Sequence, residues 1–385
     1  MKKNLSFRAP ALLLALCMAL SLLLTGCGGK GNSNGEAPTV GNLKYESTMP
    51  LEYADQFAVY RYEGGYSLID MVDSDRILVV PEGKEIPDGL DDDIVVVQQP
   101  LDHIYMAATS AMALFDAIDA LDTIAFVGTQ HWYIENAIQA MQDGKYIYAG
   151  KYNTPDYEML INQGCQLAIE STMILHNPEV KEKMMELGIK TVVERSSYED
   201  HPLGRTEWVK LYGVLLGKEE EAEAAFRTEV DKIKALEGTE STGKTVAFFY
   251  VNSNGNVVTY KTNGYVPSMI RIAGGEYIFT DLGLDEDSKL STVNMNMEEF
   301  YYTAKDADII IYNCSIVSQL HTLEDFFDQS PVLKDFKAVQ EDNVWCTSRS
   351  MFQQTDKMGS IIEEMHAIFT GEAEGEDLHY IFKLQ

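Results

Sequence analysis

Residues 207–236 read EWVKLYGVLLGKEEEAEAAFRTEVDKIKAL, and this stretch decides how the chain is organised. In its second half, apolar side chains recur at intervals of three and four residues, the spacing that places them on one face of an α-helix. Gly217 interrupts the pattern and Gly238 follows it, so we predict one or two consecutive helices over residues 207–238. This helical segment separates two parts of the chain that have patterns of their own.

The part before the helical segment is typical of an α/β domain. Residues 45–100 consist of short β-branched runs and turns, and beyond them similar runs alternate with stretches of helical spacing. The predicted strands of this alternating part cover residues 103–107, 123–128, 145–149, 167–170 and 191–194. We therefore predict an N-terminal α/β lobe over residues 45–206.

A second α/β pattern follows, and we assign it to a C-terminal lobe over residues 243–385. Its predicted elements are a strand at 245–251, a helix at 265–275, strands at 308–312 and 343–347, and a closing helix at 354–370. The expected fold is thus two Rossmann-like α/β lobes joined by a single long helix. Because ligands of parallel α/β sheets bind outside the carboxyl ends of the strands, we expect a ligand cleft between the lobes.

One short unit occurs once in each predicted lobe. Residues 155–158 (PDYE) open a short helix that leads to the strand at 167–170. Residues 297–300 (MEEF) open another that leads to the strand at 308–312. The repetition on either side of the central helix supports two related lobes.

The N-terminus has the pattern of a lipoprotein signal peptide. A positively charged start is followed by an apolar run at residues 11–24, which is too short to span a membrane comfortably. The run ends in LTGC at residues 24–27, which resembles a bacterial lipobox; a plain secretory signal is the alternative. We predict a signal peptide over residues 1–26 and a lipid-bearing Cys27 at the start of a flexible tether, 27–44. The protein is then anchored by lipid to the extracytoplasmic face of the cell membrane.

Composition and motifs argue against several functional classes. The chain has 60 acidic and 30 basic residues, a formal net charge of −30, and such a surface repels nucleic acid and anionic lipid headgroups. The sequence contains no G-x-S-x-G, Walker or H-E-x-x-H motif. We therefore expect that the protein is not an enzyme and has neither a catalytic residue nor a resident cofactor. Beyond the N-terminal region only Cys165, Cys314 and Cys346 remain, and their number and spacing predict neither a disulfide framework nor a metal site.

In the order of its elements the chain resembles the solute-binding proteins of siderophore, haem and cobalamin ABC importers. The matching stretches are 217–223 (GKEEEAE), 272–275 (IAGG), 333–345 (LKDFKAVQEDNVW) and the two repeated units. The resemblance implies two lobes joined by one rigid helix, and a monomer that delivers a metal chelate to a membrane permease and its ATPase. A ferric siderophore is the expected ligand, and haem or cobalamin are the alternatives. An adhesin or ligand sensor on the same fold is a candidate of another class.

Polar and aromatic residues in loops after the predicted strands are the candidate ligand contacts, because ring faces and guanidinium groups suit a large, flat, anionic chelate. They are Ser110, His131, Trp132, Tyr133, Met173, Arg195, Tyr198, Asn252, Arg349 and Phe352. Packing in the hydrophobic core is the alternative for Trp132, Tyr133 and Met173. Pairing with nearby carboxylates is the alternative for Arg195 and Arg349. His131 is also a candidate ligand for a haem or cobalt centre.

The resemblance gives the acidic helix starts a role, since one acidic residue of each lobe docks onto permease arginines in that family. Glu158 is the candidate in the first lobe, and Glu298 or Glu299 in the second. Alternatively, these carboxylates only complement the helix macrodipole, a contribution of ~0.3–1 kcal/mol, and Glu299 completes a capping box with Asn296. Arg205, just before the central helix, is interpreted as an anchor for that connection.

Overall fold

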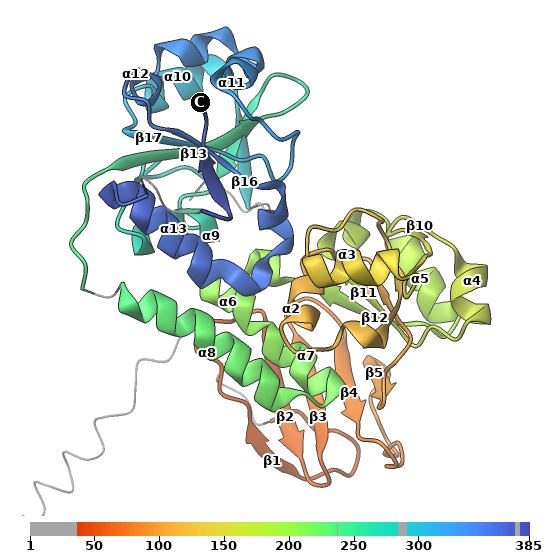
Figure 1. Ribbon diagram of the computed structural model, residues 1–385. Helices are drawn as coiled ribbons and strands as arrows, with labels where there is room; N and C mark the ends of the chain where they lie inside the picture. Colours follow the sequence, from red (N-terminus) through yellow and green to blue (C-terminus); the bar gives the residue numbers. More distant parts are fainter. Residues whose placement is uncertain (1–36, 237, 284–290, 374–377) are drawn as a thin grey trace, which may run out of the picture. The chain divides into compact units, whose positions relative to one another are not determined.

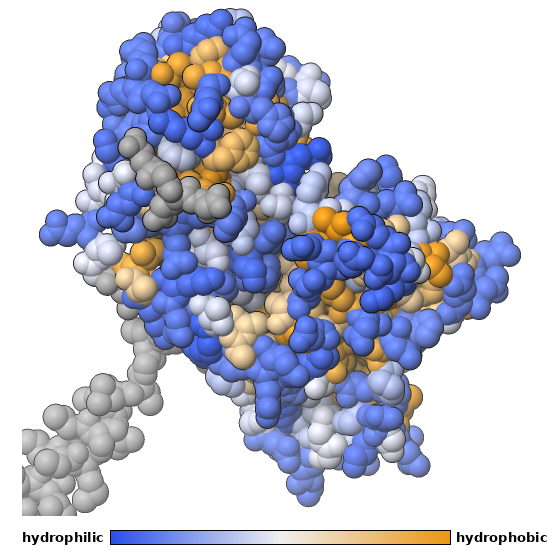
Figure 2. All heavy atoms as spheres, in the orientation of Figure 1, coloured by the Kyte–Doolittle hydropathy of each residue, from blue (hydrophilic) through white to orange (hydrophobic). Residues whose placement is uncertain are grey.

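The computed structural model describes residues 37–236, 238–283, 291–373 and 378–385, whose helices and strands are shown in Figure 1. The predicted signal peptide and Cys27 lie outside the described residues. None of the helices within these ranges is long and apolar enough to cross a membrane. Hydrophilic residues predominate on the face shown in Figure 2, as expected for a chain in which 23% of the residues are charged.

A five-stranded sheet forms the first part of the predicted N-terminal lobe, before its parallel α/β part, and confirms the strands and turns expected over residues 45–100. Its strands follow one another in the order β1 (Tyr45–Thr48), β2 (Phe57–Tyr62), β3 (Tyr66–Met71), β4 (Arg76–Val80) and β5 (Ile94–Gln98). All neighbours are antiparallel except β4 and β5. Side chains alternate between the two faces: Val59 and Ile69 join the main core, whereas Tyr62 and Leu68 pack on the other face with Val40.

The first α/β lobe is built on a parallel sheet of order β12-β11-β6-β7-β8. Its strands fall at the five predicted positions, and they are β6 (Ile104–Met106), β7 (Ile124–Val127), β8 (Ile147–Tyr148), β11 (Leu167–Ser171) and β12 (Lys190–Glu194). The helices of this lobe are α2 (Met112–Asp116), α3 (Glu135–Gln142), α4 (Tyr157–Asn162) and α5 (Pro178–Glu186). The short pair β9 (Gly150–Lys151) and β10 (Thr154–Pro155) lies before α4.

Glu170 on β11 is a buried carboxyl group without a partner. Its side chain is inaccessible to solvent, and neither of its oxygens has a hydrogen-bond partner among the described residues. Ala168, on the same face of β11, belongs to a small hydrophobic cluster that includes Tyr105 and Leu160. Burial raises the pKa of Glu170 from 4.5 to about 8, because a charge inside an apolar cluster loses its hydration.

Replacing Glu170 by methionine is therefore expected to stabilise the protein above pH 5, increasingly so up to about pH 8. Between these limits the unfolded chain has already released the proton that the folded protein retains, so wild-type stability falls as the pH rises. The gain of Glu170→Met should reach about 3 kcal/mol at pH 7. Urea titrations of both proteins at several pH values measure it, and a difference that does not change with pH would contradict the prediction.

The second lobe contains a mixed sheet of order β16-β14-β13-β17-β18-β19, with β15 beside β13. The predicted strands are its parallel centre, β13 (Thr245–Val251), β17 (Ile309–Tyr312) and β18 (Val344–Thr347). The strands β14 (Val257–Tyr260), β15 (Glu276–Tyr277), β16 (Thr292–Met295) and β19 (Ile381–Lys383) were not predicted from the sequence. β15 and β19 have only two and three residues, which carry too little periodicity for recognition, whereas β14 and β16 are as long as the predicted strands β17 and β18. The helices are α9 (Tyr265–Ile272), α10 (Met297–Ala304), α11 (Leu323–Gln329), α12 (Lys337–Gln340) and α13 (Met358–Thr370).

The connection between the lobes is a series of consecutive helices, in agreement with one of the two alternatives predicted for residues 207–238, and not the single long helix of the expected fold. It consists of α6 (Pro202–Glu207), α7 (Val209–Leu216) and α8 (Glu219–Ala235), with α7 and α8 packed side by side (Figure 1). The break predicted near Gly217 is present, since this residue ends α7 with a φ of 68°, a left-handed conformation that favours glycine. Helix α7 packs against α2 of the first lobe, and α8 packs against α13 of the second.

Candidate functional site

Loops from both lobes meet at the carboxyl ends of their parallel strands. The segment after β7 contributes His131 and Tyr133, and the one after β18 contributes the 3-10 turn Arg349–Gln353. The Tyr133 backbone N–H donates to Gln353 Oε1 (2.9 Å), and Gln353 Nε2 donates to the His131 carbonyl (3.1 Å). These two bonds join the lobes at the edge of the sheets where α/β proteins bind ligands.

Aromatic and cationic groups gather at the same contact. The rings of Tyr133 and Phe352 meet edge to face with centroids 6.1 Å apart. The guanidinium carbon of Arg349 lies 5.7 Å from the centroid of the Tyr133 ring. Tyr133 and Phe352 are partly exposed, and Arg349 and His131 are exposed. The structure thus brings together four of the predicted ligand contacts, with surfaces that can stack on a flat ligand and donate to its acidic oxygens.

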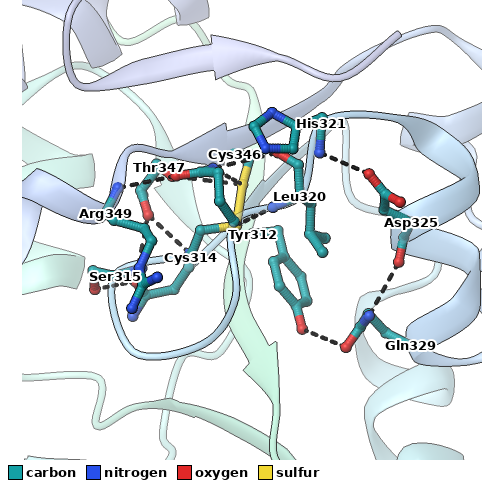
Figure 3. Close-up of a disulfide and its surroundings, with 12 residues drawn as sticks. Tyr312, Cys314, Ser315, Leu320, His321, Asp325, Gln329, Cys346, Thr347 and Arg349 are labelled. Atoms are coloured by element: carbon teal, nitrogen blue, oxygen red, sulfur yellow. Dashed lines mark hydrogen bonds between the residues drawn. A yellow bond between two sulfur atoms is a disulfide. The ribbon is translucent and has the colours of Figure 1, made fainter.

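A disulfide lies directly beside Arg349, which corrects the expectation that the cysteines would not pair (Figure 3). Cys314 follows β17 and Cys346 lies in β18, which are neighbouring strands of the second-lobe sheet. Gln319, in the loop after Cys314, accepts from the Arg349 N–H (3.1 Å) and donates to the Thr347 carbonyl (3.2 Å). The disulfide and Gln319 therefore hold two strand-end loops together at the candidate site.

A second group of predicted residues lies at the end of β12 in the first lobe. Ser110 donates through its hydroxyl to Glu194 Oε2 (2.6 Å), and Glu194 Oε1 accepts the Ser196 N–H (2.7 Å). Arg195 is only 4% exposed, and its guanidinium carbon lies 4.8 Å from the centroid of the Tyr198 ring. Glu194 was not among the residues predicted from the sequence, although its position at the last residue of a predicted strand was the available signal.

The structure places two predicted contacts elsewhere, Trp132 and Asn252, whereas Met173 remains exposed in the loop directly after β11. Trp132 is 5% exposed and belongs to the main hydrophobic core, so it packs beneath the loop instead of lying at its surface. Asn252 is not in a strand-to-helix loop, because β13 and β14 form an antiparallel hairpin. Its Oδ1 accepts the N–H groups of Asn254 and Asn256 and shapes that turn. Met173 is 48% exposed in the 3-10 turn Thr172–His176.

The structure confirms that the acidic residues of the two repeated units lie in first helical turns, where they are exposed to solvent. Glu158 lies in the first turn of α4, whose N-cap Asp156 accepts the Met159 N–H (2.9 Å). Glu298 and Glu299 lie in the first turn of α10, where the side chain of Asn296 accepts the Glu299 N–H (2.9 Å). Among the described residues no hydrogen bond or ion pair uses the carboxylates of Glu158, Glu298 or Glu299. The capping box proposed for Glu299 therefore lacks its second bond.

A cavity of about 610 Å³ lies at the other edge of the second-lobe sheet and is separate from this site. It is lined by Lys244, Ile309 and Asn343, at the amino ends of β13, β17 and β18, and by residues near the end of α13. Among the described residues no cluster of histidine, cysteine or acidic side chains has the arrangement of a metal site.

Two α/β lobes that meet through loops at the carboxyl ends of their strands define a two-lobed ligand-binding protein. The family model of periplasmic binding proteins matches residues 106–349. The chain belongs to the periplasmic binding protein family. Members of this family bind a small ligand and act with the permease and ATPase of an ABC transporter; they are binding proteins, not enzymes.

Individual proteins show the same likeness. An uncharacterized lipoprotein of Methanocaldococcus jannaschii is 26% identical over 409 residues, which cover 96% of this chain and 94% of the relative. The petrobactin-binding protein YclQ of Bacillus subtilis has a similar structure, with a TM-score of 0.57 at 13% identity over 71% of this chain and 93% of that one. A periplasmic haem-binding protein of Pseudomonas aeruginosa has a TM-score of 0.56 at 15% identity over 74% and 98% of the two chains.

Proposed function

We propose that this protein is the lipid-anchored capture subunit of an ABC importer and that its ligand is an iron chelate of the siderophore class. The contact of Tyr133, Arg349 and Phe352 between loops of both lobes is the observation that supports this function most directly. A chelate held there would stack on the rings and accept hydrogen bonds from the guanidinium group. Haem, a flat complex with two carboxylates, and a corrinoid, a flat metal macrocycle, are the alternatives, and the similar structure of the haem-binding protein favours haem.

Delivery to a permease requires a docking surface on each lobe, and we assign it to Glu158 and to Glu298 or Glu299. Helix α4 precedes the parallel strand β11, and helix α10 precedes the parallel strand β17. Each helix therefore begins at the carboxyl edge of its sheet and ends at the amino edge. Their exposed first turns accordingly face the same edge as the loops of the candidate site. The anchor at Cys27 would keep the protein close to the permease.

The absorption spectrum of the protein, purified without denaturation from the cells that naturally make it, tests this function. A ferric siderophore is expected to add a broad visible charge-transfer band, whereas haem would add a Soret band and a corrinoid its own visible bands. Tyr133→Ala should lose most of the bound chromophore, because it removes the ring between Arg349 and Phe352. Ile138→Ala, an exposed position on α3, is the control. A wild-type protein that neither carries nor binds any of the three ligand classes would contradict the proposal.

A further inference from the structure

Two arginines of the described chain are buried without a counter-ion. Arg195 is 4% exposed and Arg205 is 7% exposed, and the Nε of each lacks a hydrogen-bond partner among the described residues. By contrast, Arg61, Arg76 and Arg227 each pair with at least one carboxylate. A buried charge without a partner is unfavourable. The chain has 60 acidic residues, so carboxylates that could pair with these arginines are plentiful.

Aromatic rings are the neighbours that these guanidinium groups do have. The guanidinium carbon of Arg195 lies 4.8 Å from the centroid of the Tyr198 ring, and that of Arg205 lies 4.2 Å from the centroid of the Tyr265 ring. A ring stacked on a guanidinium group covers one face and leaves the in-plane N–H donors free. Those donors have the geometry that binds carboxylate and similar acidic oxygens.

The nearest acidic residue in the sequence does not neutralise Arg195. Both oxygens of Glu194 are engaged elsewhere, by the Ser110 hydroxyl and by the Ser196 N–H. Glu194 and Arg195 thus lie side by side in the chain, and the carboxylate holds loops of the first lobe together while the guanidinium stays unpaired.

Arg205 occupies the junction between the lobes. It lies on α6, which packs against the turn Ser196–Tyr198 of the first lobe and against α9 and α13 of the second. Its stacking partner Tyr265 opens α9, and its neighbour Thr206 donates to the Thr355 carbonyl of the second lobe (3.0 Å). The stacking on Tyr265 is compatible with the interpretation of Arg205 as an anchor for the connection, but no described residue accepts a hydrogen bond from its Nε.

We propose that Arg195 and Arg205 are anion-recognition residues and that the ligand of this protein carries at least two acidic groups that complete their pairing. The inference rests on the proposed chelate-binding function and narrows it to anionic chelates. Arg195 would bind from the first lobe. Arg205, stacked on a second-lobe ring, would bind an acidic group where the two lobes meet.

Matched probes that differ in charge test the inference on the full-length protein in detergent. One pair is a ferric tris-catecholate, a trianion, and an uncharged ferric tris-hydroxamate; the other is haem and its dimethyl ester. Quenching of tryptophan fluorescence measures each affinity. We expect the anionic member of the preferred pair to bind at least about tenfold more tightly. Arg195→Gln and Arg205→Gln should each weaken the anionic probe by roughly 10- to 100-fold and leave the neutral probe nearly unchanged.

Two further variants separate recognition from stability. Arg227→Gln, which removes a guanidinium paired with Glu52 and Glu223, should leave all affinities unchanged. Arg205→Lys should retain part of the selectivity because it retains the charge. Unliganded Arg205→Gln should melt at or above the wild-type temperature, since it removes an unpaired buried charge.

The outcomes distinguish this inference from the function on which it rests. Equal affinity for anionic and neutral probes, or a melting temperature of Arg205→Gln lowered by more than about 5 °C, would overturn the anion-recognition role and leave chelate capture standing. Failure of the wild-type protein to bind any of the three ligand classes, the four probes included, would overturn both.

Discussion

Reversal of Glu158 and Glu299 to lysine is expected to abolish ligand uptake by cells while the purified double variant binds ligand as tightly as wild type. Both side chains are exposed in first helical turns and form no described ion pair. If they meet permease arginines, the two changes place like charges opposite each other at both docking points, which disfavours the complex strongly. Uptake should fall at least about tenfold, whereas each substitution should change the folding stability by less than about 1 kcal/mol.

Glu179 and Glu324 provide a matched control for this experiment. They are also exposed acids in first helical turns, of α5 and α11, but they lie outside the repeated unit that precedes β11 and β17. Their double reversal to lysine carries the same macrodipole cost and should leave uptake intact. Acidic replacements of the matching permease arginines should partly rescue the Glu158→Lys, Glu299→Lys protein. Normal uptake by that protein with the unchanged permease would refute the docking assignment without affecting ligand capture.

Glu207→Ala should cost about 3–5 kcal/mol of unfolding free energy, the largest stability effect that the structure predicts. Glu207 is fully buried in α6, and its carboxylate accepts the backbone N–H groups of Glu52, Tyr53 and Ala54 at 2.8–3.0 Å. It also accepts from the buried ammonium group of Lys210 (2.9 Å). Alanine would leave the backbone N–H groups of Glu52, Tyr53 and Ala54 without their acceptor inside the protein and Lys210 with Glu223 as its remaining carboxylate, and unmet buried donors are costly.

Urea denaturation of two companion variants shows whether that interpretation is correct. Glu207→Gln keeps one acceptor oxygen and should lose less stability than Glu207→Ala. Glu223→Ala removes the other carboxylate that contacts Lys210, but Glu223 is half exposed, so the loss should stay below about 1 kcal/mol. A loss below 1 kcal/mol for Glu207→Ala as well would show that the backbone of residues 52–54 finds other partners.

The contacts of Glu207 also explain how the N-terminal sheet is attached. The family match begins at residue 106, after β1–β5, so this sheet is an addition to the matched region. Glu199 accepts the N–H groups of Asp55 and Gln56, next to those bound by Glu207. Burial raises the pKa of Glu199 to about 8, although these bonds act in the opposite direction. Glu199, just before the connection between the lobes, and Glu207, in α6, thus hold residues 52–56.

The sequence by itself determined the two lobes, their central strands and the break in the connection. Strands such as β13 and β17 are continuous apolar runs flanked by turns, and Gly217 has a local conformational reason to end a helix. The acidic first turns of α4 and α10 were likewise readable from a few adjacent residues. Each of these features depends on neighbours within a few positions, so the pattern alone encodes it.

Only the tertiary structure decided which distant residues face each other. Cys314 and Cys346 pair because β17 and β18 are adjacent in the sheet, an order that cysteine spacing does not encode. Trp132, which was predicted as a ligand contact, is likewise buried in the core, and the Nε of Arg205, which was predicted as an anchor, lacks a described hydrogen-bond acceptor. Pairing and burial depend on strand order and on the packing of elements far apart in the chain, whereas local periodicity reports only which face of an element is apolar.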